Sequence, residues 1–156
     1  MRNYILVIAL FAGLFTASCN KKDSSCTAAI EGAPASEVLV LDEYIVANSI
    51  DAKKDDRGFY YKIETIGTGT HPDLCSDIIV NYQGWLTNGN SFDSGQNASF
   101  ELSGLIKGWQ AGIPLIARNG KIKLYLPPSL AYGSRATSGI PANSLLIFEI
   151  ELVKIK

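Results

Sequence analysis

The sequence predicts an α+β domain in which an antiparallel β-sheet carries a single short helix. The first indication is the stretch 144–155, where apolar and polar residues alternate with the period of a half-buried strand. The second is that three further stretches, 59–66, 77–86 and 121–126, are rich in β-branched and aromatic residues. The third is that only the stretch 105–116 interrupts this pattern with helical spacing. A chain of 156 residues has room for this one domain and short extensions.

The boundaries of the strands follow from turn residues. Glycine, asparagine and proline pairs separate the four stretches. Among them, Asn88-Gly89 is typical of a tight hairpin, because both central positions of that turn favour positive φ. The apolar face of the last strand is expected to consist of Leu146, Phe148, Ile150 and Leu152.

The helix expected over 105–116 would bury one stripe against the sheet and leave room for a pocket at its end. A second helix is expected over 37–48, before the sheet. Ser36 is a suitable N-cap for it, and Glu37 lies in its first turn. Its apolar stripe would be Val38, Leu41 and Ile45.

The N-terminal residues 1–18 combine Arg2 with a short apolar run and small residues before Cys19. The run is shorter than the 20 or so apolar residues that a membrane span needs, and it is typical of a secretory signal peptide. The placement of Cys19 resembles a bacterial lipoprotein signal, in which the cysteine carries the lipid, and residues 20–23 resemble the start of Bacteroidetes lipoproteins. Plain secretion and an uncleaved anchor are the alternatives.

The chain is therefore expected to comprise a signal peptide (1–18), a lipidated flexible tether (19–36), a helix with its connector (37–57) and the folded domain (58–156). If lipid occupies Cys19, two cysteines remain, Cys26 and Cys75. They form either a disulfide between tether and domain or two free thiols.

The composition argues against several classes of function. A formal net charge of -1 gives no sign of a nucleic-acid partner. The single histidine, His71, is too little for a zinc site or a nucleophile–histidine triad, and no metal or cofactor is expected. The glycine-rich stretch 67–70 connects strands and lacks the phosphate-loop lysine. A binding groove is the remaining hypothesis, and aromatic residues on five separate elements favour it, namely Tyr82, Phe92, Trp109, Tyr132 and Phe148.

Four blocks of sequence resemble the FKBP-type peptidyl-prolyl isomerases, in the family's order and spacing. They read "VNYQGWLTNGNSFDSG", "LIKGWQAG", "LPPSLAYGS" and "IPANSLLIFEIEL". The resemblance covers residues 58–156. It implies a five- or six-stranded antiparallel sheet wrapped around one short helix, with an apolar cleft between them that takes a proline ring.

The resemblance also implies a role for individual residues. Trp109 would form the floor of the cleft, Tyr82, Phe92, Ile106 and Phe148 its walls, and Leu105 and Ile140 its rim. The Tyr132 hydroxyl and the Ile106 backbone N–H would donate to substrate carbonyls. Asp93 would either hold Tyr82 or polarise the bound amide. Ala98 stands where the family has a bulky wall residue, and the family's pocket-edge arginine has no counterpart, so a more open cleft is expected there.

The implied activity is peptidyl-prolyl cis-trans isomerisation of exported proteins. The implied partners are proline-containing polypeptides, together with a membrane reached through lipid on Cys19, and the chain is expected to be a monomer of the cell envelope, attached to the outer membrane. The alternative is a non-catalytic chaperone that binds proline-containing segments, or a subunit of an envelope complex such as motility machinery.

Overall fold

The computed structural model describes Cys26, residues 29–137 and residues 139–156. The expected signal peptide and Cys19 therefore lie outside the described residues. Within the described part of the chain, no helix is both long enough and apolar enough to cross a membrane.

Six strands form one antiparallel sheet, which confirms the predicted fold class. The strand order is β1-β2-β5-β6-β3-β4, so the C-terminal strand lies near the centre between two partners. Alternation places its apolar residues in the core as predicted, with Leu152 fully buried and Phe148 only 3% exposed. The strands are β1 (Lys53–Lys54), β2 (Tyr60–Thr65), β3 (Asp77–Leu86), β4 (Ser91–Glu101), β5 (Gly120–Leu126) and β6 (Leu146–Ile155).

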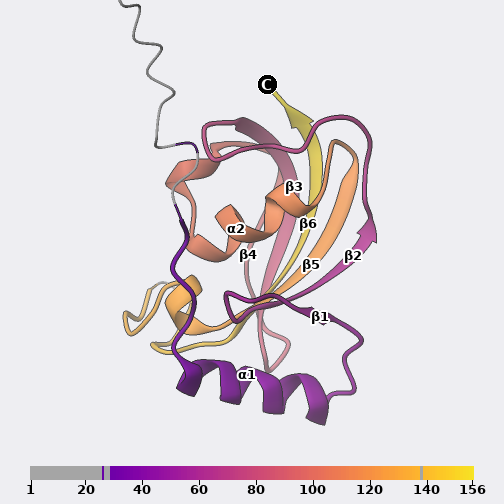
Figure 1. Cartoon of the computed structure of the whole chain (residues 1–156). Helices are drawn as coiled ribbons and strands as arrows, with labels where there is room; N and C mark the ends of the chain where they lie inside the picture. Colours follow the sequence, from indigo (N-terminus) through magenta and orange to yellow (C-terminus); the bar gives the residue numbers. More distant parts are fainter. Residues whose placement is uncertain (1–25, 27–28, 138) are drawn as a thin grey trace, which may run out of the picture.

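The short helix α2 (Lys107–Gly112) lies across one face of the sheet (Figure 1). It is shorter than the helix expected over 105–116. Ile106 has extended backbone angles and forms the N-cap, so the helix begins after it. At the other end Pro114 falls in a 3₁₀ turn, Ile113–Leu115, because proline cannot continue the α-helical hydrogen-bond ladder.

The N-terminal helix α1 (Ala35–Ala47) lies beyond one end of the sheet (Figure 1). Leu41 and Ile45 are buried against Tyr125 of β5, as the apolar stripe predicts. The expected cap is wrong, because Ser36 lies inside the first turn and the N-cap is Pro34, which has no capping side chain.

The hairpin between β3 and β4 differs from the expected turn. Among the described residues of this turn, only Gly89 has a positive φ. The Gly89 N–H donates to the Leu86 carbonyl and the Leu86 N–H to the Asn90 carbonyl, so the loop has three residues. A type I turn followed by a left-handed glycine gives this geometry, and it is a common alternative to the two-residue turn. The strand that follows, β4, is not among the stretches predicted from the sequence.

The segment before α1 is attached to the domain rather than free of it. Cys26 and Cys75 are joined by a disulfide, with their Cα atoms 5.0 Å apart. Ile30 and Ala33 pack against the main core, and the Ala33 N–H donates to the Arg57 carbonyl at 2.9 Å. In Figure 1 the indigo trace that precedes α1 runs along the side of the molecule to that helix. The expected flexible tether therefore does not extend to residue 36.

Candidate functional site

A cavity of about 140 Å³ lies between α2 and the sheet. Its lining comes from β3, β4, β6, α2 and the two loops that flank α2 and β6. Asp93 is the only charged residue among the residues that line it. They are Tyr82, Asp93, Phe100, Leu105, Ile106, Trp109, Tyr132 and Phe148.

Trp109 lies at the centre of the ring cluster and is only 4% exposed. Its ring centroid is 5.1 Å from that of Tyr82 and 5.3 Å from that of Phe148, with interplanar angles of 79° and 86°. Edge-to-face contacts of this kind each contribute about 0.5–1.5 kcal/mol beyond the area they bury. The rings therefore hold one another in place around the cavity.

Two glycines allow Trp109 to reach this position. Gly108 and Gly112 lie one helical turn apart on α2 and face β5. A Cβ atom added at Gly108 would lie 2.4 Å from a methyl group of Leu126, and one at Gly112 would lie 2.7 Å from a methyl group of Leu124. Because neither glycine carries a side chain, the helix lies close against β5.

The polar rim of the cavity is built around Asp93. The Tyr82 hydroxyl donates to Asp93 Oδ2 at 2.9 Å, and the Ser94 N–H donates to Asp93 Oδ1 at 2.8 Å. Burial, and then the hydrogen bond to Asp93, raise the pKa of Tyr82 to about 12. Two roles were expected for Asp93, to hold Tyr82 or to polarise the bound amide. The hydrogen bond from the Tyr82 hydroxyl corresponds to the first.

Tyr132 differs from Tyr82 in its surroundings. It is 40% exposed, and its hydroxyl has no hydrogen-bond partner among the described residues. Burial, and then the negative charge of Asp93, raise its pKa above the ordinary value. The hydroxyl therefore stays protonated at neutral pH and is available to donate a hydrogen bond.

The segment before α2 supplies a backbone donor. Gln110 Nε2 donates to the Ser103 carbonyl at 2.9 Å and to the Leu105 carbonyl at 2.6 Å, which holds this segment against the helix. The next residue, Ile106, is the N-cap of α2, and no acceptor for its N–H occurs in the described part of the chain. This N–H is therefore free to donate at the edge of the cavity.

Phe92 does not line the cavity as a wall. Its ring packs on Phe148, with centroids 5.5 Å apart, and both rings lie over Gly84. In the pairing of β3 with β4, Gly84 is opposite Asp93 and Trp85 is opposite Ser91, so Phe92 is the extra residue of a bulge. A bulge breaks the alternation of a strand. It explains how the Phe92 ring packs on Phe148 while the neighbouring Asp93 carboxylate lines the cavity.

Ile140 also lies behind the cavity rather than at its rim. It is 5% exposed and belongs to the main core. Two reciprocal backbone hydrogen bonds with Thr137, of 2.9 and 3.0 Å, hold its backbone in place. The other predicted residues, Tyr82, Asp93, Leu105, Ile106, Trp109, Tyr132 and Phe148, all line the cavity.

Phe100 is a lining residue that the sequence prediction lacks. Its ring is 6.2 Å from Trp109 and 6.1 Å from Tyr82, so it forms the wall that was expected to be open at Ala98. The signal for it is the alternation of Ala98, Phe100 and Leu102 with polar neighbours. The polar residues earlier in β4 hide that pattern.

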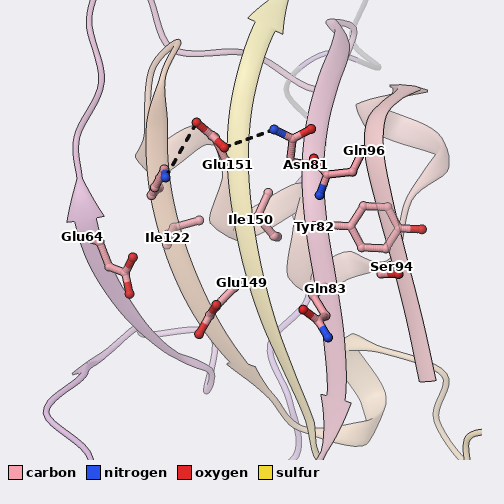
Figure 2. A pocket seen from close by; sticks show the side chains of 11 residues that line it. Glu64, Asn81, Tyr82, Gln83, Ser94, Gln96, Ile122, Glu149, Ile150 and Glu151 are labelled. Carbon is pink, nitrogen blue, oxygen red and sulfur yellow. Dashed lines mark hydrogen bonds and ion pairs between the residues drawn. The ribbon is translucent and has the colours of Figure 1, made fainter. Parts of the chain in front are cut away.

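A larger groove of about 360 Å³ lies on the opposite face of the sheet (Figure 2). Its side chains are mostly polar, and three of them are paired with one another: Glu151 accepts a hydrogen bond from Asn81 at 3.1 Å and lies 3.8 Å from the Lys121 ammonium group. Such a surface favours water over a proline ring. Within the ranges described, no group of three histidine, cysteine or acidic side chains is placed to hold a metal ion.

Comparison with known proteins agrees with this geometry. The family model for FKBP-type peptidyl-prolyl cis-trans isomerases matches residues 69–153. An isomerase of this type from Aeromonas hydrophila, FkpA, is 39% identical over 121 residues, which are 74% of this chain and 45% of that protein. FkpA from Escherichia coli K12 is 42% identical over 108 residues, covering 67% of this chain and 40% of that protein.

Solved structures of FkpA and of another peptidyl-prolyl cis-trans isomerase also resemble this chain. The crystal structure of FkpA from Escherichia coli superposes with a TM-score of 0.71 and 38% identity, over 78% of this chain and 60% of that one. A peptidyl-prolyl cis-trans isomerase from Pseudomonas syringae superposes with a TM-score of 0.69 and 28% identity, over 80% of this chain and 97% of that one.

The chain belongs to the FKBP-type peptidyl-prolyl cis-trans isomerase family. It spans less than half the length of the two curated relatives.

Proposed function

We propose that this chain is an active peptidyl-prolyl cis-trans isomerase whose substrates are proline-containing segments of exported proteins. The observation that carries the proposal is the ring-lined cavity, with Asp93 the one charged residue among those that line it. A proline ring is apolar and compact, and the amide that precedes it is polar. The cavity offers an apolar floor for the first and hydrogen-bond donors for the second.

The reaction requires no covalent chemistry. Amide resonance gives the peptide bond a rotation barrier of about 18–20 kcal/mol, and the uncatalysed isomerisation of X-Pro bonds takes tens to hundreds of seconds. Moving the amide from water into an apolar cavity disfavours its planar, charge-separated form. The twisted form has less charge separation, so its energy rises less. A cavity that also fits the twisted shape binds the transition state more tightly than the ground state.

Four residues have distinct roles in this mechanism. Trp109 lies beneath the proline ring and excludes water from it. The Ile106 N–H and the Tyr132 hydroxyl donate to the substrate's carbonyl groups as the bond turns. Asp93 holds the Tyr82 ring in the wall, through the hydrogen bond of 2.9 Å.

The proposal is tested by NMR exchange spectroscopy on a Leu-Pro model peptide, with the protein at substoichiometric concentration. We expect the unchanged protein to speed cis/trans exchange relative to the peptide alone. We expect Asp93→Leu to speed it less than the unchanged protein does. Peptide binding without acceleration, by protein shown to be folded, would instead favour the non-catalytic binding module.

The cellular placement is part of the same proposal. Cys19 follows an apolar run with small residues before it, and it would carry the lipid that attaches the domain to the cell envelope, at the outer membrane. Fractionation of cells that express the chain tests this. We expect the protein in the membrane fraction and its Cys19→Ser variant outside that fraction. An unchanged distribution would exclude lipid on Cys19 as the anchor.

A further inference from the structure

The N-terminal helix contacts the loop that carries Tyr132. Glu37, in the first turn of α1, accepts a hydrogen bond from the Ser129 backbone N–H at 2.8 Å. Ser129 lies in the 3₁₀ turn η4 (Pro128–Leu130), three residues before Tyr132. The two partners are 92 residues apart in the chain, and Glu37 lies outside the region that the family model matches.

The local sequence explains why this N–H needs a partner from elsewhere. The first N–H groups of a helical turn have no acceptor within the turn. Pro127 and Pro128 have no N–H at all, so Ser129 carries the first donor of the turn. The Ser129 hydroxyl is buried without a hydrogen-bond partner among the described residues, which indicates that water reaches this point poorly. The carboxylate of Glu37 therefore satisfies a donor that would otherwise be left unpaired.

The turn that Glu37 caps also sets the position of Tyr132. The Pro128 carbonyl accepts hydrogen bonds from the Ala131 N–H at 2.9 Å and from the Gly133 N–H at 2.8 Å. These two donors are the residues on either side of Tyr132. A shift of the turn at Ser129 would therefore move the backbone from which the Tyr132 ring reaches the cavity.

Other contacts of α1 attach the helix to the domain without Glu37. Leu41 is 1% exposed and Ile45 is 6% exposed, both against Tyr125. Asp42 accepts hydrogen bonds from Lys54 at 2.7 Å and from the Tyr60 hydroxyl at 2.9 Å. The Glu37 carboxylate can therefore be removed while the helix stays in place.

We propose that Glu37 is a positioning residue for the isomerase site: from α1 it holds the turn at Ser129 and thereby the Tyr132 hydroxyl at the cavity. This proposal rests on the proposed function, because Tyr132 is its point of action. It makes α1 part of the site's support.

The test compares three variants of the purified protein in the peptide-exchange assay. Glu37→Ala removes the acceptor, and we expect kcat/KM to fall about two- to tenfold, as for the loss of one hydrogen bond. Glu37→Gln keeps an acceptor oxygen at the same reach, and we expect activity within about twofold of the unchanged protein. Glu43→Ala is the matched control, because Glu43 is an exposed glutamate of the same helix, and we expect no change.

A double-mutant cycle with Tyr132→Phe separates positioning from a general loss of stability. If Glu37 acts through the Tyr132 hydroxyl, Glu37→Ala should cause little further loss in the Tyr132→Phe background. Full activity of folded Glu37→Ala, or a loss of the same size in both backgrounds, would overturn the proposal. If Glu37→Ala fails to fold, Glu37→Asp replaces it, because the shorter side chain keeps the charge but not the reach.

An inactive unchanged protein would refute the proposed function and leave the contact itself open to measurement. In that case the Ser129 amide and Tyr132 ring resonances are compared between the unchanged protein and Glu37→Ala. Chemical-shift changes at both the Ser129 amide and the Tyr132 ring would support the positioning of the loop by Glu37. Shifts confined to α1 would overturn it.

Discussion

The hydroxyl groups of two tyrosines lie at the site, and only one of them has a hydrogen-bond partner among the described residues. The Tyr82 hydroxyl is engaged by Asp93, whereas the Tyr132 hydroxyl has no partner among the described residues. An engaged hydroxyl fixes its ring, and an unengaged one is available to substrate. At the scale of single residues, the proposed mechanism therefore assigns Tyr82 to the wall and Tyr132 to the donor role.

Replacing Tyr132 with phenylalanine removes that donor and little else. Because one hydrogen bond contributes about 0.5–1.5 kcal/mol, we expect kcat/KM for the Leu-Pro peptide to fall about two- to tenfold. The measurement is the same NMR exchange assay. Tyr44→Phe is the control, since Tyr44 lies on α1 away from the cavity, and its activity should not change. Equal activity of Tyr132→Phe and the unchanged protein would contradict the role of Tyr132.

Tyr82 should ionise at a pH well above the ordinary pKa of a phenol. Burial and the hydrogen bond to Asp93 raise its pKa from 10.0 to about 12. The folded protein thus keeps a proton that the unfolded chain releases near pH 10, so the stability due to this group is present below pH 10 and is lost as the pH rises to 12.

A spectrophotometric titration of tyrosinate absorbance checks this prediction. The difference between the curves of the unchanged protein and Tyr82→Phe should show one step near pH 12. If the titration step that Tyr82→Phe removes lies near pH 10, the ordinary pKa of a phenol, the prediction is contradicted.

At the scale of elements, the position of each helix follows from the residues on one of its faces. These are glycines without side chains on α2 and buried apolar side chains on α1. On α2, Gly108 and Gly112 allow the helix to lie close against β5, which brings Trp109 into the ring cluster. On α1, the side chains of Leu41 and Ile45 are buried against Tyr125, whereas Leu39 is 62% exposed. Leu41 and Ile45 are therefore the two buried residues of α1.

Leu41→Ala should destabilise the protein by about 2–5 kcal/mol, because it removes a fully buried side chain and leaves a cavity. Leu39→Ala changes the same residue type on the same helix at an exposed position, and we expect a change within about 0.5 kcal/mol. Urea unfolding of the two variants gives both free energies. Similar values for the two would show that α1 is not packed through Leu41.

At the scale of the whole molecule, the disulfide and α1 attach the N-terminal segment at two points. Cys26 is joined to Cys75, and Glu37 reaches the turn that precedes Tyr132. The segment between them packs on the main core through Ile30 and Ala33. Cys26, residues 29–34 and α1 are thus attached to the domain.

Reduction of the disulfide should lower the free energy of unfolding by about 2–4 kcal/mol, because a cross-link over 49 residues restricts the unfolded chain. The unfolding of the oxidised protein is compared with that of Cys26→Ser/Cys75→Ser. Since neither cysteine lines the cavity, isomerase activity well below the unfolding temperature should stay the same. Equal stability of the two proteins would show that the bond does not restrict the unfolded chain.

Most of the site was predictable because its residues lie in regular or strongly patterned segments. Trp109 and Phe148 lie where helical spacing and strand alternation place them, and Tyr82 and Tyr132 belong to blocks that resemble the family. One error lies where pairing changes register, because Phe92 falls in a bulge that depends on the partner strand. Phe100 follows a run of polar residues on β4 that conceals its alternation, and Ile140 lies in the loop before β6, where no periodicity predicts its burial.

The sequence by itself determined the α+β class, the apolar face of β6 and, apart from Phe100, the aromatic residues that meet around α2. These follow from local periodicity and residue type, which depend only on near neighbours in the chain. The tertiary structure alone decided that Asp93 engages Tyr82, that Cys26 pairs with Cys75 and that Glu37 reaches Ser129. Each of these contacts joins residues from separate elements, and its formation depends on atomic distances that only the packed fold sets.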